Sequence, residues 1–206
     1  MKTRAHGAWL PAAVLAAVAA LVARSPEADA RPRKAYWMVS FLGGALLPVR
    51  ETADQRELGL GVGLKVGFTG KIGLGVALSA QYSPLPVADP ADGDEAADDV
   101  VENHFVSGAL VPRFTLGRGA LRLTLGAGGG FMMERTTSRA AAADGEEAGE
   151  RSTASVLAAT GVGEVGLETY LWDSGGLVVT GSYLRAFGDS ESEIASVLGG
   201  LVFTFR

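Results

Sequence analysis

The sequence predicts an all-β fold, an eight-stranded antiparallel up-and-down β-barrel, and three observations support this. Eight segments alternate apolar residues with small or polar ones at a period of two, which is the pattern of strands with two different faces. Glycine is unusually frequent, at 29 of 206 residues, without the period of collagen. The connections alternate between tight turns and long polar loops, as the hairpins of an up-and-down barrel do.

The first 30 residues have the features of a cleaved signal peptide. Lys2 and Arg4 precede an apolar stretch at 9–22, and Ala28-Asp29-Ala30 has the A-x-A pattern of a cleavage site. The apolar stretch is shorter than the ~20 residues of a spanning helix, which disfavours the alternative of an uncleaved anchor. We therefore expect a signal peptide at 1–30 and a barrel domain at 31–206.

Each of the eight segments is about as long as the ~9–11 residues of a tilted membrane strand. A helix would spread the same apolar residues over all its sides, and each interior glycine would cost it ~1 kcal/mol. Pro112 lies inside one segment and predicts a break or bulge, because proline cannot donate to a ladder. The expected strands are Tyr36–Leu47, Leu58–Thr69, Ile72–Tyr82, His104–Leu116, Leu121–Met133, Ser155–Leu171, Leu177–Phe187 and Ile194–Phe205.

The connections between these strands fall into two classes that alternate along the chain. Short turns at one end and long loops at the other are typical of outer-membrane barrels. A soluble sandwich has no reason to sort its loops in this way. The short turns are Gly70-Lys71, Gly117–Gly119 and Trp172–Gly176, and the long loops are Val49–Glu57, Ser83–Asn103, Glu134–Ala154 and Gly188–Glu193.

The composition of the two strand faces indicates which one meets lipid. The leucine- and valine-rich face carries almost no charge, while the other face is mostly glycine, alanine, serine and threonine. A soluble exterior normally has about a quarter to a third charged residues. The apolar face is therefore expected to point outward, which makes the barrel transmembrane. The alternative is a soluble, lipocalin-like barrel that binds an apolar ligand inside and has a charged exterior.

Aromatic residues concentrate near the ends of the expected strands, as in the two girdles that flank the apolar band of a membrane barrel. Chance placement at strand ends is the competing explanation. The expected girdle residues are Tyr36, Trp37, Phe68, Tyr82, Phe105, Phe114, Phe131, Tyr170, Trp172 and Phe187.

A few charged residues fall on the inward face and should pair there, since an unpaired buried charge is very costly. Eight strands leave an interior that side chains just fill, so a structural network is favoured over a gated conduction path. Arg185 fits either the outer rim or, with a bulge, the interior. The expected interior network consists of Lys65, Arg113, Arg122, Glu164 and Glu168.

Other chemistry finds little support. The carboxylates of the Ser83–Asn103 loop lack a calcium-loop spacing and favour a solvated surface segment. His104 and Ser107 suggest a lipid hydrolase as a minor alternative, but residues three apart on a strand point to opposite faces. No motif for a cofactor, phosphate or zinc occurs. With 18 basic against 23 acidic residues, a net charge of −5, nucleic acid is disfavoured as a partner.

The C-terminus carries the most specific feature, Gly200-x-x-Phe203-x-Phe205, which is followed by Arg206. With this motif, the chain resembles the eight-stranded outer-membrane barrel superfamily, which includes the OmpA-like transmembrane domain and porin-like relatives. Members of that superfamily usually end in the aromatic residue, without a residue such as Arg206 after it. The resemblance implies a Gram-negative outer membrane, periplasmic termini, contact with lipid and lipopolysaccharide, and recognition of the last strand by the barrel-assembly machinery. It implies a non-enzymatic, structural role or a narrow passage for small solutes.

Overall fold

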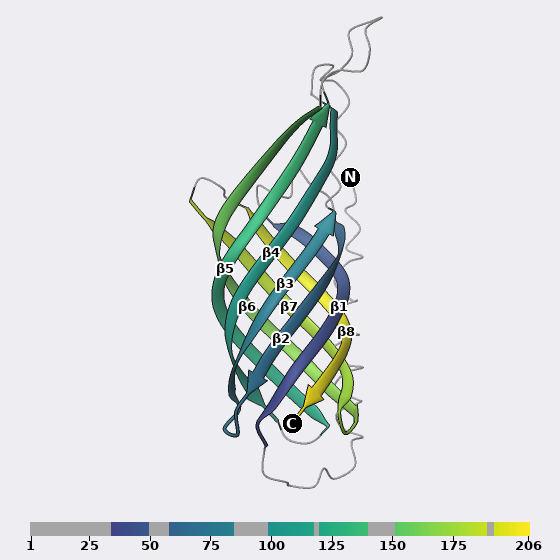
Figure 1. The fold of residues 1–206 in the computed structure, drawn as a ribbon, viewed down its shortest axis with the longest axis vertical. Helices are drawn as coiled ribbons and strands as arrows, with labels where there is room; N and C mark the ends of the chain where they lie inside the picture. Colours follow the sequence, from purple (N-terminus) through teal and green to yellow (C-terminus); the bar gives the residue numbers. More distant parts are fainter. Residues whose placement is uncertain (1–33, 50–57, 85–98, 118–119, 140–150, 189–191) are drawn as a thin grey trace, which may run out of the picture.

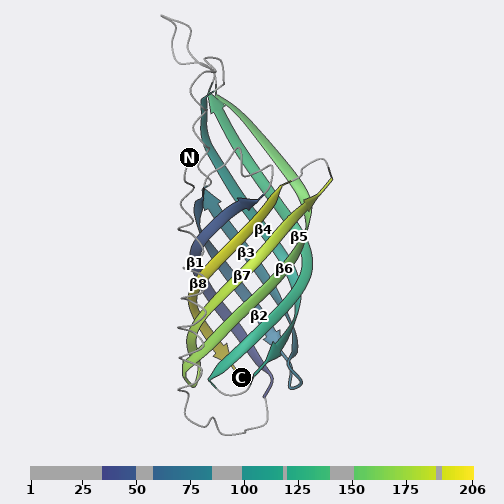
Figure 2. The same cartoon turned by 180° about the vertical axis from the view of Figure 1, so that it is seen from behind.

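The computed structural model describes residues 34–49, 58–84, 99–117, 120–139, 151–188 and 192–206, and the expected signal peptide lies outside them. Eight antiparallel strands follow one another in chain order around a closed barrel (Figures 1 and 2). The fold class expected from the alternating segments is confirmed. The strands are β1 Tyr36–Val49, β2 Gly59–Thr69, β3 Leu74–Pro84, β4 Asp99–Leu116, β5 Leu121–Arg139, β6 Arg151–Trp172, β7 Gly175–Phe187 and β8 Glu193–Phe205.

The first and last strands close the barrel. The ladder between β1 and β8 runs from Trp37 opposite Phe205 to Val49 opposite Glu193. Closure removes the free strand edges, which would otherwise leave backbone N–H and C=O groups unpaired. A sheet that is exposed to lipid must pair all of these groups internally. None of the described residues forms a helix that is long and apolar enough to cross a bilayer.

The tight turns gather at one end of the barrel, here called the turn end, where β1 begins and β8 finishes (Figure 1). At the first turn, Gly70 N–H donates to the Leu74 carbonyl over 2.7 Å, and Gly73 has a φ of 88°. The expected start of the third strand at Ile72 is therefore wrong, because the left-handed backbone of Gly73 ends the turn before β3 begins.

Strands β4, β5 and β6 extend well beyond the other strands at the opposite end, here called the loop end (Figures 1 and 2). The β5–β6 ladder continues without a register shift to Arg139 opposite Arg151. The expected strand boundaries at His104, Met133 and Ser155 are wrong, because β4, β5 and β6 continue past them to Asp99, Arg139 and Arg151. The extensions of β5 and β6 are rich in serine, threonine and arginine, and that of β4 combines two valines with acidic residues and an asparagine, so none has the apolar alternation on which those boundaries rested.

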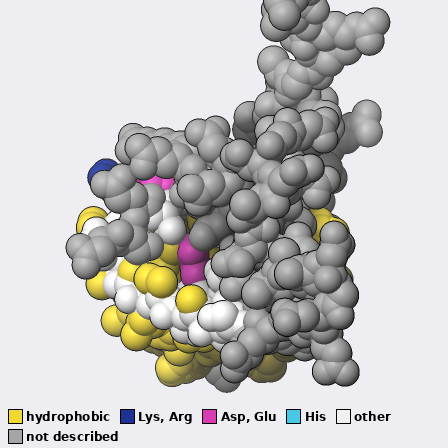
Figure 3. Space-filling view, turned by 90° about the horizontal axis from the view of Figure 1, so that it is seen from above, with side chains coloured by type: hydrophobic (Ala, Val, Ile, Leu, Met, Phe, Trp, Pro, Cys, Tyr) yellow, Lys and Arg dark blue, Asp and Glu magenta, His cyan; other side chains and the backbone are white. Residues whose placement is uncertain are grey.

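The apolar face points outward, as the composition of the faces predicts. Leu60 is 73% exposed and Leu78 61%, whereas Lys65 on the opposite face is buried. Seen from the loop end, hydrophobic side chains lie along the outside of the part of the wall that is visible, and acidic side chains are visible on its inner side (Figure 3). An exterior of this kind is that of a barrel in hydrocarbon, with its polar residues toward the axis.

The ladder between β4 and β5 is interrupted at Pro112. Leu110 pairs with Gly129 and Arg113 with Gly126, but the two positions between them are unpaired and the register on either side is unchanged. The interruption follows from the missing N–H of proline. Pro112 therefore produces a local break rather than a bulge.

Candidate functional site

Polar side chains from three strands meet inside the lumen near the turn end. Arg113 Nη1 on β4 lies 3.5 Å from Glu168 Oε1 on β6, and Arg113 Nη2 donates to Thr69 Oγ1 over 2.7 Å. Tyr170 donates its hydroxyl to Glu168 Oε2 over 2.8 Å. Both charged side chains are almost completely buried, so these bonds replace the water that each of them loses.

Arg122 completes this layer from β5. Its guanidinium carbon lies 4.7 Å from the ring centre of Tyr36 and 4.3 Å from that of Tyr170, so it is held between two aromatic faces. Tyr36 in turn is the register partner of Thr69. These residues form one group at the turn end, the lumen-floor cluster: Tyr36, Thr69, Arg113, Glu168, Tyr170 and Arg122.

A second ion pair lies closer to the middle of the barrel. Lys65 and Glu164 stand four residues from Thr69 and Glu168 along β2 and β6. Lys65 Nζ lies 2.7 Å from Glu164 Oε1, with side chains that are 6% and 5% exposed. The two strands are not neighbours in the barrel, so this pair spans the lumen.

Toward the loop end most inward-facing side chains are uncharged, and Glu134 on β5 is a buried carboxylate on the same face as Met132. Gln81 donates to Ser182 Oγ over 3.4 Å, and Ser182 and Ser196 share a hydrogen bond of 2.6 Å. Beyond them lies the apolar layer, a set of buried hydrophobic side chains from five strands. Its members are Leu46, Phe105, Met132, Leu184 and Ile194.

Several buried lumen atoms have no hydrogen-bond partner among the residues that the structure describes. In the lumen-floor cluster these are Tyr36 Oη, Arg113 Nε and Arg122 Nη1. Among the described residues, the inward-facing charges of this half of the barrel are three cations and two carboxylates. These described residues therefore carry one more positive than negative charge.

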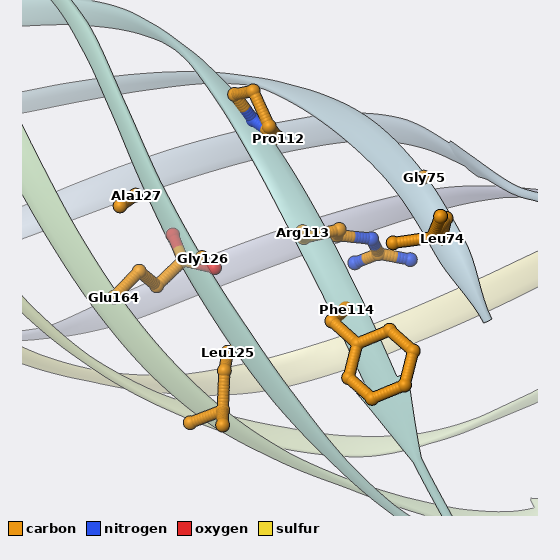
Figure 4. Close-up of a pocket in the computed structure, with 9 residues that line it drawn as sticks. All are labelled: Leu74, Gly75, Pro112, Arg113, Phe114, Leu125, Gly126, Ala127 and Glu164. Carbon is orange, nitrogen blue, oxygen red and sulfur yellow. The ribbon is translucent and has the colours of Figure 1, made fainter.

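A pocket of about 570 Å³ opens in the barrel wall beside the Pro112 break (Figure 4). Leucine and phenylalanine side chains from the outer surface line its mouth, and two charged residues of the interior line it as well. The lining residues are Leu74, Gly75, Pro112, Arg113, Phe114, Leu125, Gly126, Ala127 and Glu164.

The expected interior residues all lie on the inner face of the barrel, whereas three of the expected girdle residues do not lie on its outer surface. All five interior residues point inward, in two separate ion pairs with Arg122 against the aromatics. Three girdle assignments are wrong. Tyr36 and Phe105 are buried core residues, and Tyr170 packs against that core. Side chains alternate between the two faces of a strand, and the position of each of these three residues places it on the inner face. The other girdle residues lie on the outer surface: Trp37, Phe68, Tyr82, Phe114, Phe131, Trp172 and Phe187.

Arg185 lies outside the barrel, near the loop end. Its side chain is 59% exposed, and Nε lies 3.6 Å from Glu193 Oε1 on the neighbouring strand. Tyr183 also donates a hydrogen bond to Glu193. The rim position considered for Arg185 is therefore the observed one, and β7 has no bulge that would turn it inward.

His104 and Ser107 do not form a catalytic pair. His104 Nδ1 lies 3.0 Å from the Tyr82 hydroxyl on the outer surface, and the two rings stack. Ser107 is buried on the inner face. The acidic residues of the Ser83–Asn103 loop fall mostly outside the described residues. No group of three or more histidine, cysteine or acidic residues that could hold a metal occurs in the described ranges.

Sequence reasoning missed three parts of the site: Thr69 as a partner of Arg113, the apolar layer, and the wall pocket. The alternation of side chains along each strand could have predicted the first two, because Thr69 lies on the same face as Lys65 and Phe105 on the same face as Arg113. The pocket leaves no such signal, because it depends on residues of four strands meeting at one place.

Comparison with solved structures places the fold. The chain is similar to a major outer membrane protein from Thermus thermophilus, with a TM-score of 0.61, 13% identity, and 84% of this chain and 100% of that chain covered. Neisserial surface protein A matches with a TM-score of 0.59 and 10% identity, over 84% of this chain and 100% of that chain. OprG from Pseudomonas aeruginosa matches with a TM-score of 0.58 and 12% identity, over 84% of this chain and 97% of that chain.

No family model matches the chain, and no curated protein sequence matches it. The identities to the solved structures are too low to carry residue roles across. The closed eight-stranded topology, the apolar exterior and the polar interior agree with the likeness. The chain thus has the fold of the small eight-stranded outer-membrane β-barrels.

Proposed function

We propose that the protein is an integral outer-membrane barrel of a Gram-negative bacterium, with a closed lumen and a structural role. One observation carries the closed lumen: the buried pair of Lys65 and Glu164 joins strands on different sides of the barrel, above the lumen-floor cluster. The apolar layer adds a second obstruction toward the loop end. A hydrophobic constriction resists water and ions even when it is not completely filled.

The turn end faces the periplasm in this proposal, because short turns lie on that side in barrels of this type. The C-terminus, Arg206, and the start of β1 are both at this end (Figure 1). The polar extensions of β4, β5 and β6 then stand outside the cell. Arg185 and Arg135, which are exposed near the loop end, would meet phosphate groups of lipopolysaccharide there.

The last strand is proposed as the segment that the barrel-assembly machinery recognises. Phe203 and Phe205 share the outer face of β8, where they are accessible from the membrane side. Gly200 pairs with Leu42 of β1, and a Cβ at this glycine would overlap the carbonyl oxygen of Phe41. The motif thus combines an aromatic surface with a glycine that closure of the barrel requires.

Membrane fractionation and planar-bilayer recording test the proposal. The wild-type protein should need detergent for extraction, migrate as a heat-modifiable band, and give no steady unitary current. A Phe105→Ala, Met132→Ala double variant should begin to conduct, because it truncates two large side chains of the apolar layer. Steady unitary currents from the wild type would refute the closed lumen, and extraction without detergent would refute the membrane location.

A narrow passage for small solutes is the second candidate, and the unpartnered lumen atoms favour it. Ser40 Oγ, Gln81 Oε1 and Thr160 Oγ1 are buried without a partner in the described chain, and polar atoms of this kind are commonly bridged by water. Brief openings in the wild type, with a conductance that changes in Glu164→Gln, would support the passage. A lipocalin-like binder is disfavoured by the apolar exterior.

A further inference from the structure

Charge is distributed very unequally between the two ends of the barrel. The four long loops of the loop end carry 18 acidic residues and 5 basic ones. Outside the lumen, the segments that precede, follow or connect strands at the turn end carry six basic side chains and one acidic side chain. The turn end is therefore the cationic end of an acidic protein. Its basic residues are Arg31, Arg33, Lys34, Lys71, Arg118 and Arg206, and its acidic residue is Asp173.

Three of these cations lie within the described ranges, at the ends of three consecutive strands. Lys34 precedes β1, Lys71 lies in the turn after β2, and Arg206 follows β8. Strands β8, β1 and β2 are neighbours in the barrel, and these ends of the strands are at the turn end (Figure 1). Lys34 and Lys71 each lie two residues beyond the last pair of the β1–β2 ladder, Tyr36 opposite Thr69. The three residues are here called the turn-end basic cluster.

The turn-end basic cluster is exposed and has no counter-charge of its own. Each of its three residues is exposed, and none forms an ion pair with any residue in the part of the chain that the structure describes. Like charges at the ends of neighbouring strands repel one another, and an anion placed beside them lowers that energy. The cluster is therefore a surface that favours a negatively charged partner.

Aromatic side chains next to the cluster place it at the level of lipid headgroups. Trp37 pairs with Phe68 of β2 and with Phe205 of β8, and the ring centres of Trp37 and Phe68 are 5.3 Å apart. All three rings lie on the outer face, and each cation of the cluster is within three residues of one of them. An aromatic girdle marks the boundary between hydrocarbon and headgroups, and long cationic side chains just beyond it reach phosphate groups.

We propose that the turn-end basic cluster binds anionic phospholipids through their phosphate groups, an inference that rests on the membrane location proposed above. A headgroup phosphate lies beside Lys34 and Lys71, and the acyl chains lie against Trp37 and Phe68. A zwitterionic phospholipid is a poorer partner, because its own cation meets the cations of the cluster. A soluble polyanion is also poorer, because it has no apolar part to cover the aromatic rings beside the cluster.

The test uses tryptophan fluorescence, since the two tryptophans outside the expected signal peptide, Trp37 and Trp172, are both exposed at the turn end. The mature protein with Trp172→Phe, refolded into phosphatidylcholine vesicles, keeps Trp37 as its reporter. Phosphatidylglycerol or phosphatidylcholine with brominated acyl chains is added, and each quenches a tryptophan that it contacts. At low ionic strength, the apparent association constant from quenching of Trp37 should be about fivefold higher or more for phosphatidylglycerol, the effect of one cation beside an anionic surface.

Trp172 provides a control at the same end of the barrel. It ends β6, adjoins Asp173 and is not next to the cluster, which belongs to β8, β1 and β2. In Trp37→Phe, where Trp172 is the reporter, the two brominated lipids should quench about equally. An equal preference for phosphatidylglycerol at both tryptophans would refute the cluster as the binding surface.

Two double variants in the Trp172→Phe background test the charges directly. Lys34→Gln, Lys71→Gln should bring the preference at Trp37 close to one, whereas Lys34→Arg, Lys71→Arg is the matched control that keeps both charges and should retain the preference. Both positions lie outside the strand ladders, so heat-modifiable migration should be unchanged.

The opposite results overturn the inference. A preference that survives in the glutamine variant, or is lost in the arginine variant, would refute recognition by charge. No preference at Trp37 in a heat-modifiable, inserted barrel would refute the binding surface and leave the proposed function intact. A protein that does not insert into vesicles would instead count against the proposed function itself.

Discussion

Lys65 Nζ lies 2.7 Å from Glu164 Oε1 across the lumen, between two strands that are not neighbours in the barrel. Both side chains are nearly inaccessible, so neither charge has bulk water in place of its partner. A buried pair of this kind adds little by itself compared with apolar packing, but the loss of one member leaves an uncompensated charge. The pair therefore makes each of its residues intolerant of single substitution.

Lys65→Met should lower the free energy of unfolding by ~3–5 kcal/mol, because Glu164 then remains buried and unpaired. The double variant Lys65→Met, Glu164→Gln should recover a large part of this loss. Urea unfolding in lipid vesicles measures both values. Lys71→Met is the control, since Lys71 is exposed in the first turn and should change stability little. Additive losses in the double variant would contradict the pairing.

Two tyrosines of the lumen-floor cluster should respond in opposite ways to removal of the hydroxyl group. Tyr170→Phe should lower stability by ~1.5–3 kcal/mol, because Glu168 loses a charge-assisted hydrogen bond of 2.8 Å. Tyr36→Phe should be nearly neutral or stabilising, since its buried hydroxyl has no partner in the described residues. Unfolding of the two variants side by side measures the difference, and equal losses would contradict the arrangement.

Gly200→Ala should reduce folding yield, because its Cβ would overlap the Phe41 carbonyl oxygen where β8 closes on β1. Gly199→Ala is the matched control. A Cβ there would have its nearest atom, the Val178 carbonyl oxygen, at 3.8 Å, which is ordinary van der Waals contact. The heat-modifiable fraction on a detergent gel after refolding measures both variants, and similar yields would argue against the close approach.

Leu78→Arg should cost ~2–4 kcal/mol of stability, because this exposed leucine lies in the middle of β3 and would put a charge into hydrocarbon. Leu47→Arg, near the loop end of β1, should cost ~0–1 kcal/mol. Unfolding in lipid vesicles provides the comparison. A soluble barrel would tolerate both substitutions about equally, so the depth dependence is the informative result.

The sequence by itself determined the number of strands, the face of each strand that points outward, and the charged residues that point inward. These properties are local: a side chain alternates with its neighbours whatever the rest of the chain does. For the same reason strict parity should have placed Tyr36, Phe105 and Tyr170 inside. Grouping them by their position near strand ends, without regard to parity, produced the wrong girdle assignments.

Only the tertiary structure decided which inward residues meet. Lys65 pairs with Glu164 while Arg113 pairs with Glu168, although strand parity alone leaves both carboxylates open to either cation. The stagger between strands accumulates around the closed barrel and sets the height of every side chain in the lumen. The wall pocket beside Pro112 depends on the same stagger, because it needs β3, β4, β5 and β6 to meet at one level.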